Sequence, residues 1–529
     1  MPHASCTSSQ HNTTRIPEQS RLIARLPSNG FHDQEVNALT KALQHAELEL
    51  ADVQREPLRL LNMKAPFNCL PNEIISHILQ CVVEDDNAEV HCYGHCAAEI
   101  RLIMSVCQLW RLVAISTPRI WNSFSVKNAI ESHPQIDHIN HHLDRSGAVP
   151  INLRIRDANI GGLSQFAQGP ESSLRASVIN CAGDFFLCVA SVKCHLWRCR
   201  NLDINLQGTV AARDVLPLNG PLTNLQSLSL QFSDQVTSYI ATENISLVDE
   251  GSSCRLRELR IRAKEIPPML LQYINSKFIT DLRFNISQVR GSSVPPQHLD
   301  DFILGCPAVE TMMLEYNFPM GYHPTPRDIS TPNLRVLHLT GYYMTPYLKS
   351  WNAPRLRELF IQNPMAGLET PTFQFPALES LALVDVFADR ATDENFLFTI
   401  LNNHPTLTTL ATVNTHRDMA YLFKILLDTC PNLSTLALSI DCAMNLDSSV
   451  PSILALLEKR PQIHLNFTRN LNWDEVEDKI LQDLQASHPE RVFVAWVYQE
   501  RSPIDFPTTF EFDWEEFEDL EDWYGPDDY

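Results

Sequence analysis

A recurring phrase of proline and leucine, Pro-x-Leu-x-x-Leu-x-Leu, constrains the fold of this chain more than any other feature. Clean copies begin at Pro332, Pro354, Pro376 and Pro431. Weaker copies begin at Pro307, Pro405 and Pro461, and copies without the proline begin at Leu225, Leu256 and Ile279. Successive copies from Pro307 onward are 22 to 30 residues apart. A unit repeated at this interval is typical of a solenoid, in which each repeat is stabilised by its neighbours.

Within each copy, the Leu-x-Leu portion predicts a short strand with one buried face, because successive side chains point to opposite faces of a strand. An apolar helical segment precedes several prolines, as in Leu426-Leu427 before Pro431. Proline cannot continue a helix and therefore marks the passage from helix to strand. A last unit is predicted from a helix through Val476, Ile480 and Leu484 and a strand over 492–497.

The expected fold is therefore α/β, with an irregular leucine-rich-repeat solenoid over 136–500. Its curved sheet would line the concave side and its helices the convex side. Residues 151–220 are too irregular to divide into units. The side chains between the leucines would point to the open side of the sheet. They form the row Ser229, Arg260, Arg283, Met313, His338, Phe360, Ala382 and Ala437.

Composition and charge narrow the function classes. The net charge of −22 argues against nucleic-acid binding, which needs a basic surface to displace counterions from phosphate. No glycine-rich phosphate loop, hydrolase motif or zinc-protease motif occurs, so we expect no enzyme activity and no cofactor. The 14 cysteines are scattered, and no signal peptide or run of 18 apolar residues is present. We therefore expect no membrane segment and a cytoplasmic and/or nuclear location.

One cluster of metal-capable side chains occurs in His91-Cys92-Tyr-Gly-His95-Cys96. Zinc sites usually draw their ligands from two separated pairs, whereas these four groups crowd one segment with no second pair. The sequence therefore predicts no metal site.

The N-terminal part begins with a polar segment, 1–33, that we expect to be disordered. A helix with coiled-coil character is predicted over 34–57, where Pro57 would end it. Its apolar side chains alternate at intervals of three and four, at Val36, Leu39, Leu43, Ala46, Leu50 and Val53. This seam is consistent with a short helix packed on the next domain or with a dimer contact.

Two amphipathic helices are predicted in the next segment. The first begins at Leu70-Pro71, where a proline in the first turn loses no hydrogen bond. Its apolar stripe comprises Ile74, Ile75, Ile78, Leu79 and Val82. The second helix carries Leu102, Ile103, Val106, Cys107 and Trp110, and Pro118 to Trp121 closes the segment.

These residues resemble an F-box, which would occupy 66–125. The resemblance rests on Leu70-Pro71-Asn-Glu-Ile74-Ile75, Val106-Cys107-Gln-Leu-Trp110 and Pro118-x-x-Trp121. Residues 84–98 are longer and more polar than the usual link between the two F-box helices. Segments from His142 to Leu153 and from Trp197 to Ile204 look like elements that follow the F-box in fungal F-box and leucine-rich-repeat families.

The resemblance implies a substrate-recognition subunit of a cullin-RING ubiquitin ligase. The F-box would bind a Skp-type adaptor and through it a cullin, and the repeats would capture a protein substrate. The adaptor-binding residues would be Leu70, Pro71, Ile74, Ile75, Ile78, Leu79, Val106, Cys107 and Trp110. Alternatively, the apolar faces pack on the first repeats, and the chain is a leucine-rich-repeat scaffold with no role in ubiquitination.

Substrate-binding candidates on the solenoid are Arg260, Arg262, Arg283, His338 and Phe360. The three arginines could form a basic patch for an acidic or phosphorylated ligand, or a solvated surface partly offset by neighbouring acids. The C-terminal segment, 501–529, has 11 acidic side chains and six aromatic residues spread between Phe510 and Tyr524. It is either a solvated tail or a ligand for such a patch, in which case its deletion would increase partner binding.

Overall fold

The structure of the chain is a computed structural model. It describes residues 30–85, 95–128, 135–157, 185–216, 218, 222–248, 254–286, 297–316, 328–341, 348, 351–362, 374–384, 390–413, 419–440, 446–469 and 475–496. The chain divides into two units. The first unit comprises Met1–Ile78 and Arg101–Ala114, and the second comprises Leu79–Ile100 and Ile115–Tyr529.

The first unit is helical. It holds α2 (Gly30–Lys64), the short 3₁₀ helix η1 (Pro66–Cys69), and parts of α3 (Asn72–Asp85), α4 (His95–Val106) and α5 (Gln108–Ser116). Helix α2 continues through Pro57 to Lys64, so the predicted end at Pro57 is wrong. Leucine, glutamate, glutamine and arginine, all strong helix formers, stand on both sides of Pro57 and favour continuation despite the lost backbone donor.

The second predicted helix is in fact two helices, α4 and α5, which are separated at Cys107. The Cys107 sulfur accepts a hydrogen bond from the Trp110 backbone N–H at 3.5 Å. The Arg111 side chain donates to the Met104 carbonyl at 2.9 Å, near the end of α4. Side chains thus satisfy backbone groups on both sides of the break, which a stripe of apolar residues does not reveal.

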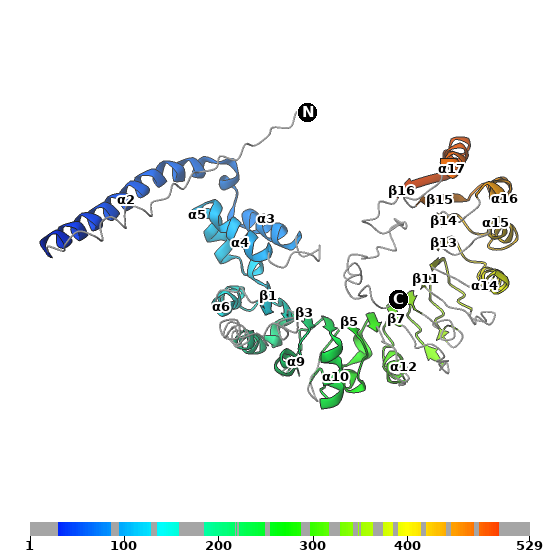
Figure 1. Cartoon of the computed structure of the whole chain (residues 1–529), viewed down its shortest axis with the longest axis horizontal. Helices are drawn as coiled ribbons and strands as arrows, with labels where there is room; N and C mark the ends of the chain where they lie inside the picture. Colours follow the sequence, from blue (N-terminus) through cyan, green and yellow to red (C-terminus); the bar gives the residue numbers. More distant parts are fainter. Residues whose placement is uncertain are drawn as a thin grey trace. The chain divides into compact units, whose positions relative to one another are not determined.

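The second unit is a mixed α/β structure built on a 14-stranded sheet in which every described strand pair is parallel, as in an α/β solenoid (Figure 1). The strands follow one another in sequence order except that β8 (Ile329–Ser330) and β10 (Trp351–Asn352) form a separate pair. The strands of the large sheet are β1 (Ser123–Asn128), β2 (Ile151–Asp157), β3 (Cys199–Leu206), β4 (Ser227–Phe232), β5 (Glu258–Ala263), β6 (Asp281–Ile286), β7 (Thr311–Tyr316), β9 (Val336–Thr340), β11 (Glu358–Gln362), β12 (Ser380–Val384), β13 (Thr409–Val413), β14 (Thr435–Ile440), β15 (His464–Arg469) and β16 (Val492–Trp496).

Helices that alternate with the strands lie along one face of this sheet (Figure 1). We call the opposite face the open face. The helices that lie wholly within this unit include η2 (Pro118–Trp121), α6 (Gln135–Ser146), η3 (Leu196–Arg198), α9 (Thr209–Val215), α10 (Asp234–Glu243), α11 (Pro268–Leu271), η4 (Ser276–Phe278), α12 (Gln297–Leu304), α14 (Arg390–Asn403), α15 (Met419–Asp428), α16 (Leu446–Lys459) and α17 (Glu475–Ser487).

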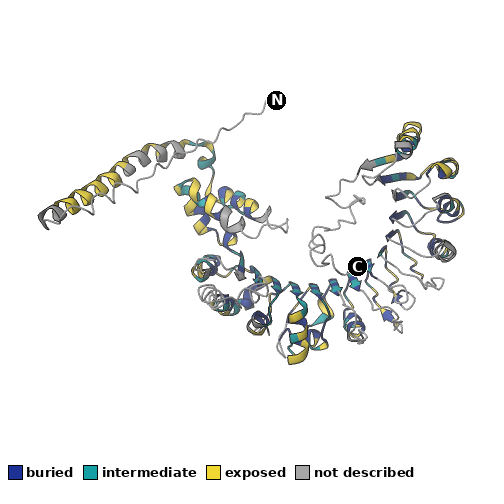
Figure 2. Cartoon of the chain, viewed as in Figure 1, coloured by how far each residue is buried: buried dark blue, intermediate teal, exposed yellow. Residues whose placement is uncertain are grey.

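The leucine positions predicted from the sequence align in register across the sheet. Leu337 lies opposite Met312 on β7 and Leu359 on β11, and the alignment continues through Leu381 to Leu410. These side chains are buried in one core cluster that runs from Val126 to Val492 (Figure 2). Ile329 of β8 and Trp351 of β10 belong to the same cluster. The buried Leu-x-Leu frame is therefore confirmed, and so is the last unit, formed by α17 and β16.

A backbone ladder joins the turns that precede the strands. The amide of Arg335 donates to the carbonyl of Glu310 at 2.8 Å, and the amide of Arg357 donates to the carbonyl of Arg335 at 2.8 Å. The asparagine of the Pro-Asn-Leu phrase adds a second link, since Asn333 donates to the Pro307 carbonyl at 2.9 Å. Asn432 makes the corresponding bond to the Pro405 carbonyl at 3.0 Å. The phrase thus connects each unit to the preceding one.

Three strands begin the sheet before the first predicted copy of the phrase. β1 lies next to the segment from Pro118 to Trp121, and β2 and β3 lie in the stretch that the sequence could not divide. No described helix is long and apolar enough to cross a membrane. Residues 1–29 of the predicted N-terminal tail and the C-terminal segment, 501–529, lie outside the described residues. Gly30 to Asp33, also predicted to be disordered, are instead the first residues of α2, so that part of the prediction is wrong.

Candidate functional site

Helices α3, α4 and α5 expose several large apolar side chains to solvent. In the first unit, Ile74 is 47% exposed, Leu102 66%, Val106 52% and Leu112 57%. Val82 at the end of α3 and Ile115 on α5 are also exposed. Exposed apolar side chains gathered on a few short helices are typical of a protein-binding surface, because leaving them in water is unfavourable.

The predicted adaptor-binding residues divide into three groups by burial. Pro71, Ile74 and Val106 are exposed, and Leu70, Ile78, Cys107 and Trp110 are half-buried. Ile75 and Leu79 are buried, at 0% and 1% exposure, and belong to the interior. The carbonyl of Pro71 accepts hydrogen bonds from the amides of Ile74 and Ile75, at 3.0 and 3.1 Å, and so starts α3.

Trp110 makes its main contacts within the first unit. Its indole N–H donates to the side-chain oxygen of Asn68 at 2.9 Å, and its ring lies 4.9 Å from the ring of Phe67. These contacts attach η1 to α5. Trp110 thus takes part in packing within the first unit while remaining half-buried, and Ile74, Val106, Leu102 and Leu112 are the more exposed apolar side chains.

The second surface is the open face of the sheet. Pairing of the strands places Ser229, Arg260, Arg283, Met313, His338, Phe360 and Ala382 in one row across β4 to β12. This is the row that alternation predicted. Ala411, which the predicted row did not include, continues this row between Ala382 and Ala437. The weaker phrase at Pro405 gave the signal that could have placed it.

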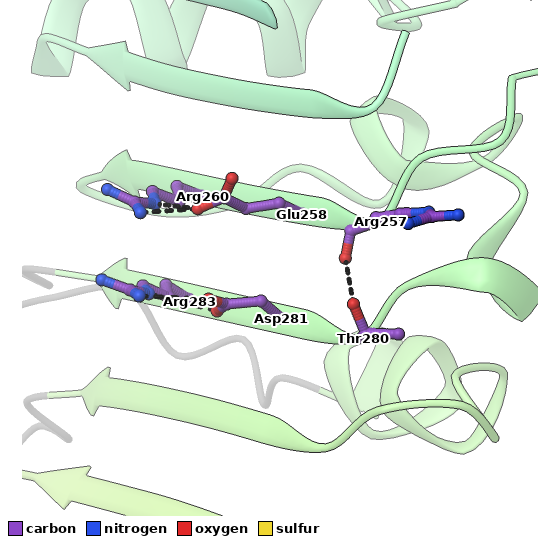
Figure 3. A network of polar contacts seen from close by, with 6 residues as sticks. All are labelled: Arg257, Glu258, Arg260, Thr280, Asp281 and Arg283. Carbon is purple, nitrogen blue, oxygen red and sulfur yellow. Dashed lines mark hydrogen bonds and ion pairs between the residues drawn. The ribbon is translucent and has the colours of Figure 1, made fainter. Parts of the chain in front are cut away.

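Arg260 and Arg262 lie on β5 and Arg283 lies on β6, and an acidic side chain stands beside each of Arg260 and Arg283 (Figure 3). Arg260 donates to Glu258 at 2.7 Å, and Arg283 donates to Asp281 at 3.1 and 3.0 Å. Each pair joins residues two apart on one strand, which share a face. The predicted basic patch is thus a surface of paired charges.

One more acidic side chain, Glu315, which was not among the predicted site residues, lies on β7. Glu315 on β7 accepts a hydrogen bond from Asn285 at 2.6 Å. Burial raises the pKa of the Glu315 carboxyl, and the nearby charge of Arg262 opposes this rise. For Glu258, burial also favours a higher pKa, but the charge of Arg260 and hydrogen bonds from Ser227 and Arg260 leave the pKa below its ordinary value. Strand alternation would have found Glu315, two residues after Met313.

From β11 to β14 the open face carries a cluster of apolar side chains. At its border the rings of His338 and Phe360 are tilted by 42° with their centroids 5.4 Å apart, and burial lowers the pKa of His338 to about 4. Neutral His338 therefore suits the apolar side of this boundary at neutral pH. Phe360 belongs to a second hydrophobic cluster, separate from the main core, that comprises Phe360, Ala382, Val384, Ala411, Val413 and Ala437.

Among the residues that the structure describes, no group of three or more His, Cys, Asp or Glu side chains could hold a metal ion. His91 and Cys92 lie outside the described residues, as do the side chains of His95 and Cys96. Comparison of the chain with protein-family models and with curated proteins finds no match. The two surfaces above are therefore described by their own chemistry: exposed apolar side chains on α3, α4 and α5, and paired charges beside an apolar cluster on the open face.

Proposed function

We propose that this chain is the substrate-recognition subunit of a cullin-RING ubiquitin ligase. An F-box formed by α3, α4 and α5 would bind a Skp-type adaptor. The second unit, as an irregular leucine-rich-repeat solenoid, would present the open face to a protein substrate. The chain itself would carry out no chemistry, since ubiquitin transfer would take place on its partners.

The observation that carries this proposal is the exposure of Ile74 and Val106. Both belong to the segments whose sequence resembles an F-box, and both are about half exposed, at 47% and 52%. Because each is already about half buried, covering the rest against a partner would contribute about half of the roughly 1.5 to 3 kcal/mol that full burial of such a side chain provides. Trp110, by contrast, would support the surface from behind through its contacts with Phe67 and Asn68.

Co-purification with a Skp-type adaptor and a cullin tests the proposal. We expect the intact chain to be retained and the double variant Ile74→Asp, Val106→Asp to lose binding by at least about tenfold, because two buried charges would lack partners. The matched control is Leu454→Asp, which changes an exposed leucine on α16 and should leave adaptor binding unchanged. Circular dichroism would show that all variants are folded.

Two results would count against the proposal. If the intact chain binds no Skp-type adaptor, the helices of the first unit have another role, and the scaffold function without ubiquitination takes first place. If the adaptor binds but the double variant binds equally well, the exposed side chains named here are not the contact surface.

A further inference from the structure

Helix α2 carries an apolar seam that is exposed along its described length. Val36, Leu39, Leu43, Leu50 and Val53 are 46% to 69% exposed, and with Ala46 they occupy alternating intervals of three and four. In heptad terms, Val36, Leu43 and Leu50 are a positions, and Leu39, Ala46 and Val53 are d positions. A single helix with such a seam leaves its apolar stripe in water.

The length of α2 makes this seam long enough to pair. Because the helix continues through Pro57 to Lys64, the heptad frame extends to Leu60 at the next d position, which is 49% exposed. The seam thus covers about three and a half heptads, which reaches the length expected of a coiled coil. Pro57 occupies one a position and Ala46 one d position, so two layers are weak and the remaining six carry the pairing.

We propose that α2 pairs in parallel with α2 of a second copy of this chain. A strict alternation of three and four matches a partner helix with the same spacing, and an identical helix provides it. Parallel pairing places Leu60 opposite Leu60 of the second copy. An antiparallel pair that keeps every layer would set Val36 opposite Leu60 and would bring Glu49 near Glu49 and Glu47 near Glu47, whose like charges oppose it.

Charges beside the seam permit this arrangement. In a parallel pair, each g position lies near the e position five residues later on the other helix. Glu35 would then lie near Thr40, Ala42 near Glu47, and Glu49 near Gln54. No two acidic residues face each other at these positions, so like charges do not oppose pairing of identical helices.

The mass of the full-length chain in solution, measured by light scattering over a range of micromolar concentrations, tests the pairing. We expect the mass to rise with concentration from 60.1 kDa, the mass of one chain, towards twice that value. Leu43→Glu with Leu50→Glu should weaken dimerisation by at least about tenfold, because it places charges at two adjacent a layers. Leu48→Glu is the matched control.

Leu48 is also an exposed leucine of α2, at 68%, but it occupies an f position away from the seam. Leu48→Glu should therefore leave the dimer intact, and Ala46→Leu should strengthen it. A mass of one chain at every concentration would overturn the proposal and leave the seam to a different helical partner. Equal weakening by Leu48→Glu and by the seam variant would overturn it as well, as would an unchanged dimer in the seam variant.

Discussion

A buried arginine in the second unit links the end of α15 to the next repeat. Arg460, which is 8% exposed, donates hydrogen bonds to the carbonyls of Thr429 and Cys430 and, at 3.3 Å, to that of Leu427. These carbonyls lie at the end of α15, where backbone acceptors lack partners within the helix and a positive charge is favourable. The guanidinium thus stabilises the passage from one unit to the next.

His142 on α6 shows how burial fixes a protonation state. The side chain is 1% exposed, with its ring centroid 5.1 Å from Trp121, 5.7 Å from Phe124 and 4.6 Å from His138. Burial lowers the pKa of His142 to about 4, and the charges of His138, Arg145 and His141 act in the same direction, against the opposing effect of the nearby Trp121 backbone. The folded state therefore holds the neutral imidazole.

This burial predicts a loss of stability in acid. Between the ordinary histidine pKa of 6.5 and about 4, the unfolded chain binds a proton that folded His142 does not, so stability falls as pH decreases through this window. The contribution of His142 is complete above pH 6.5, and its loss would amount to about 3 kcal/mol by pH 4. Urea unfolding of the chain and of His142→Phe at pH values from 7.5 to 4.5 would measure how the free energy of unfolding of each protein changes with pH. A pH slope equally steep in both proteins would contradict the prediction.

At the scale of single elements, the sulfur atom of Cys107 contributes to the break between α4 and α5. Cys107 stands just before α5, and its thiol accepts the Trp110 amide, as the oxygen of a serine N-cap would. The same residue contacts Asn68 at 3.9 Å, which links the break to η1. We infer that Cys107 fixes where α5 begins and thereby where the side chain of Leu112 is presented.

Substitution at Cys107 should therefore follow N-cap preferences. Cys107→Ala removes the acceptor and should destabilise the start of α5 by about 1 kcal/mol, whereas Cys107→Ser should retain or increase its stability. Hydrogen exchange of the amides in 108–116 would report this, with roughly fivefold faster exchange in the alanine variant. Equal acceleration by serine and alanine would show that the thiol acts only through packing.

The elements that could be predicted are those in which one residue type repeats at one position. Each leucine of the phrase has a fixed place on a strand, so the frame, the buried face and the open-face row followed from alternation. β1 could not be found in this way, because Ser123–Asn128 has no Leu-x-Leu pattern. The packing of Trp110 on Phe67 and its bond to Asn68 join residues about 40 positions apart, which no local pattern encodes. The break at Cys107 rests on contacts of the cysteine thiol and the Arg111 side chain, which a pattern of apolar residues does not show.

Across the whole second unit, the open face changes character along the sheet. The strands from β5 to β7 present paired charges, with Arg260, Arg262 and Arg283 balanced by Glu258, Asp281 and Glu315. The strands from β11 to β14 present the apolar cluster around Phe360. A ligand that spans this boundary would combine charged groups with apolar side chains, and the acidic and aromatic segment 501–529, which lies outside the described residues, has one such composition.

A peptide of the acidic segment can be used to test whether the open face of the sheet binds it. A labelled peptide of residues 505–529 should bind to the chain that lacks these residues, and the affinity should fall with added salt because charges contribute. Replacing Arg260, Arg262 and Arg283 by alanine should weaken binding by about fivefold or more, since each exposed ion pair contributes roughly 0.2 to 1 kcal/mol.

Glu258→Gln with Asp281→Asn should have the opposite effect, because it releases guanidinium groups from their present partners. Arg335→Ala with Arg357→Ala, on arginines in the turns before β9 and β11, is the control that should change nothing. Binding that is insensitive to the three open-face arginines would mean that charge pairing within the sheet leaves no basic surface, and that the apolar cluster alone would have to select the ligand.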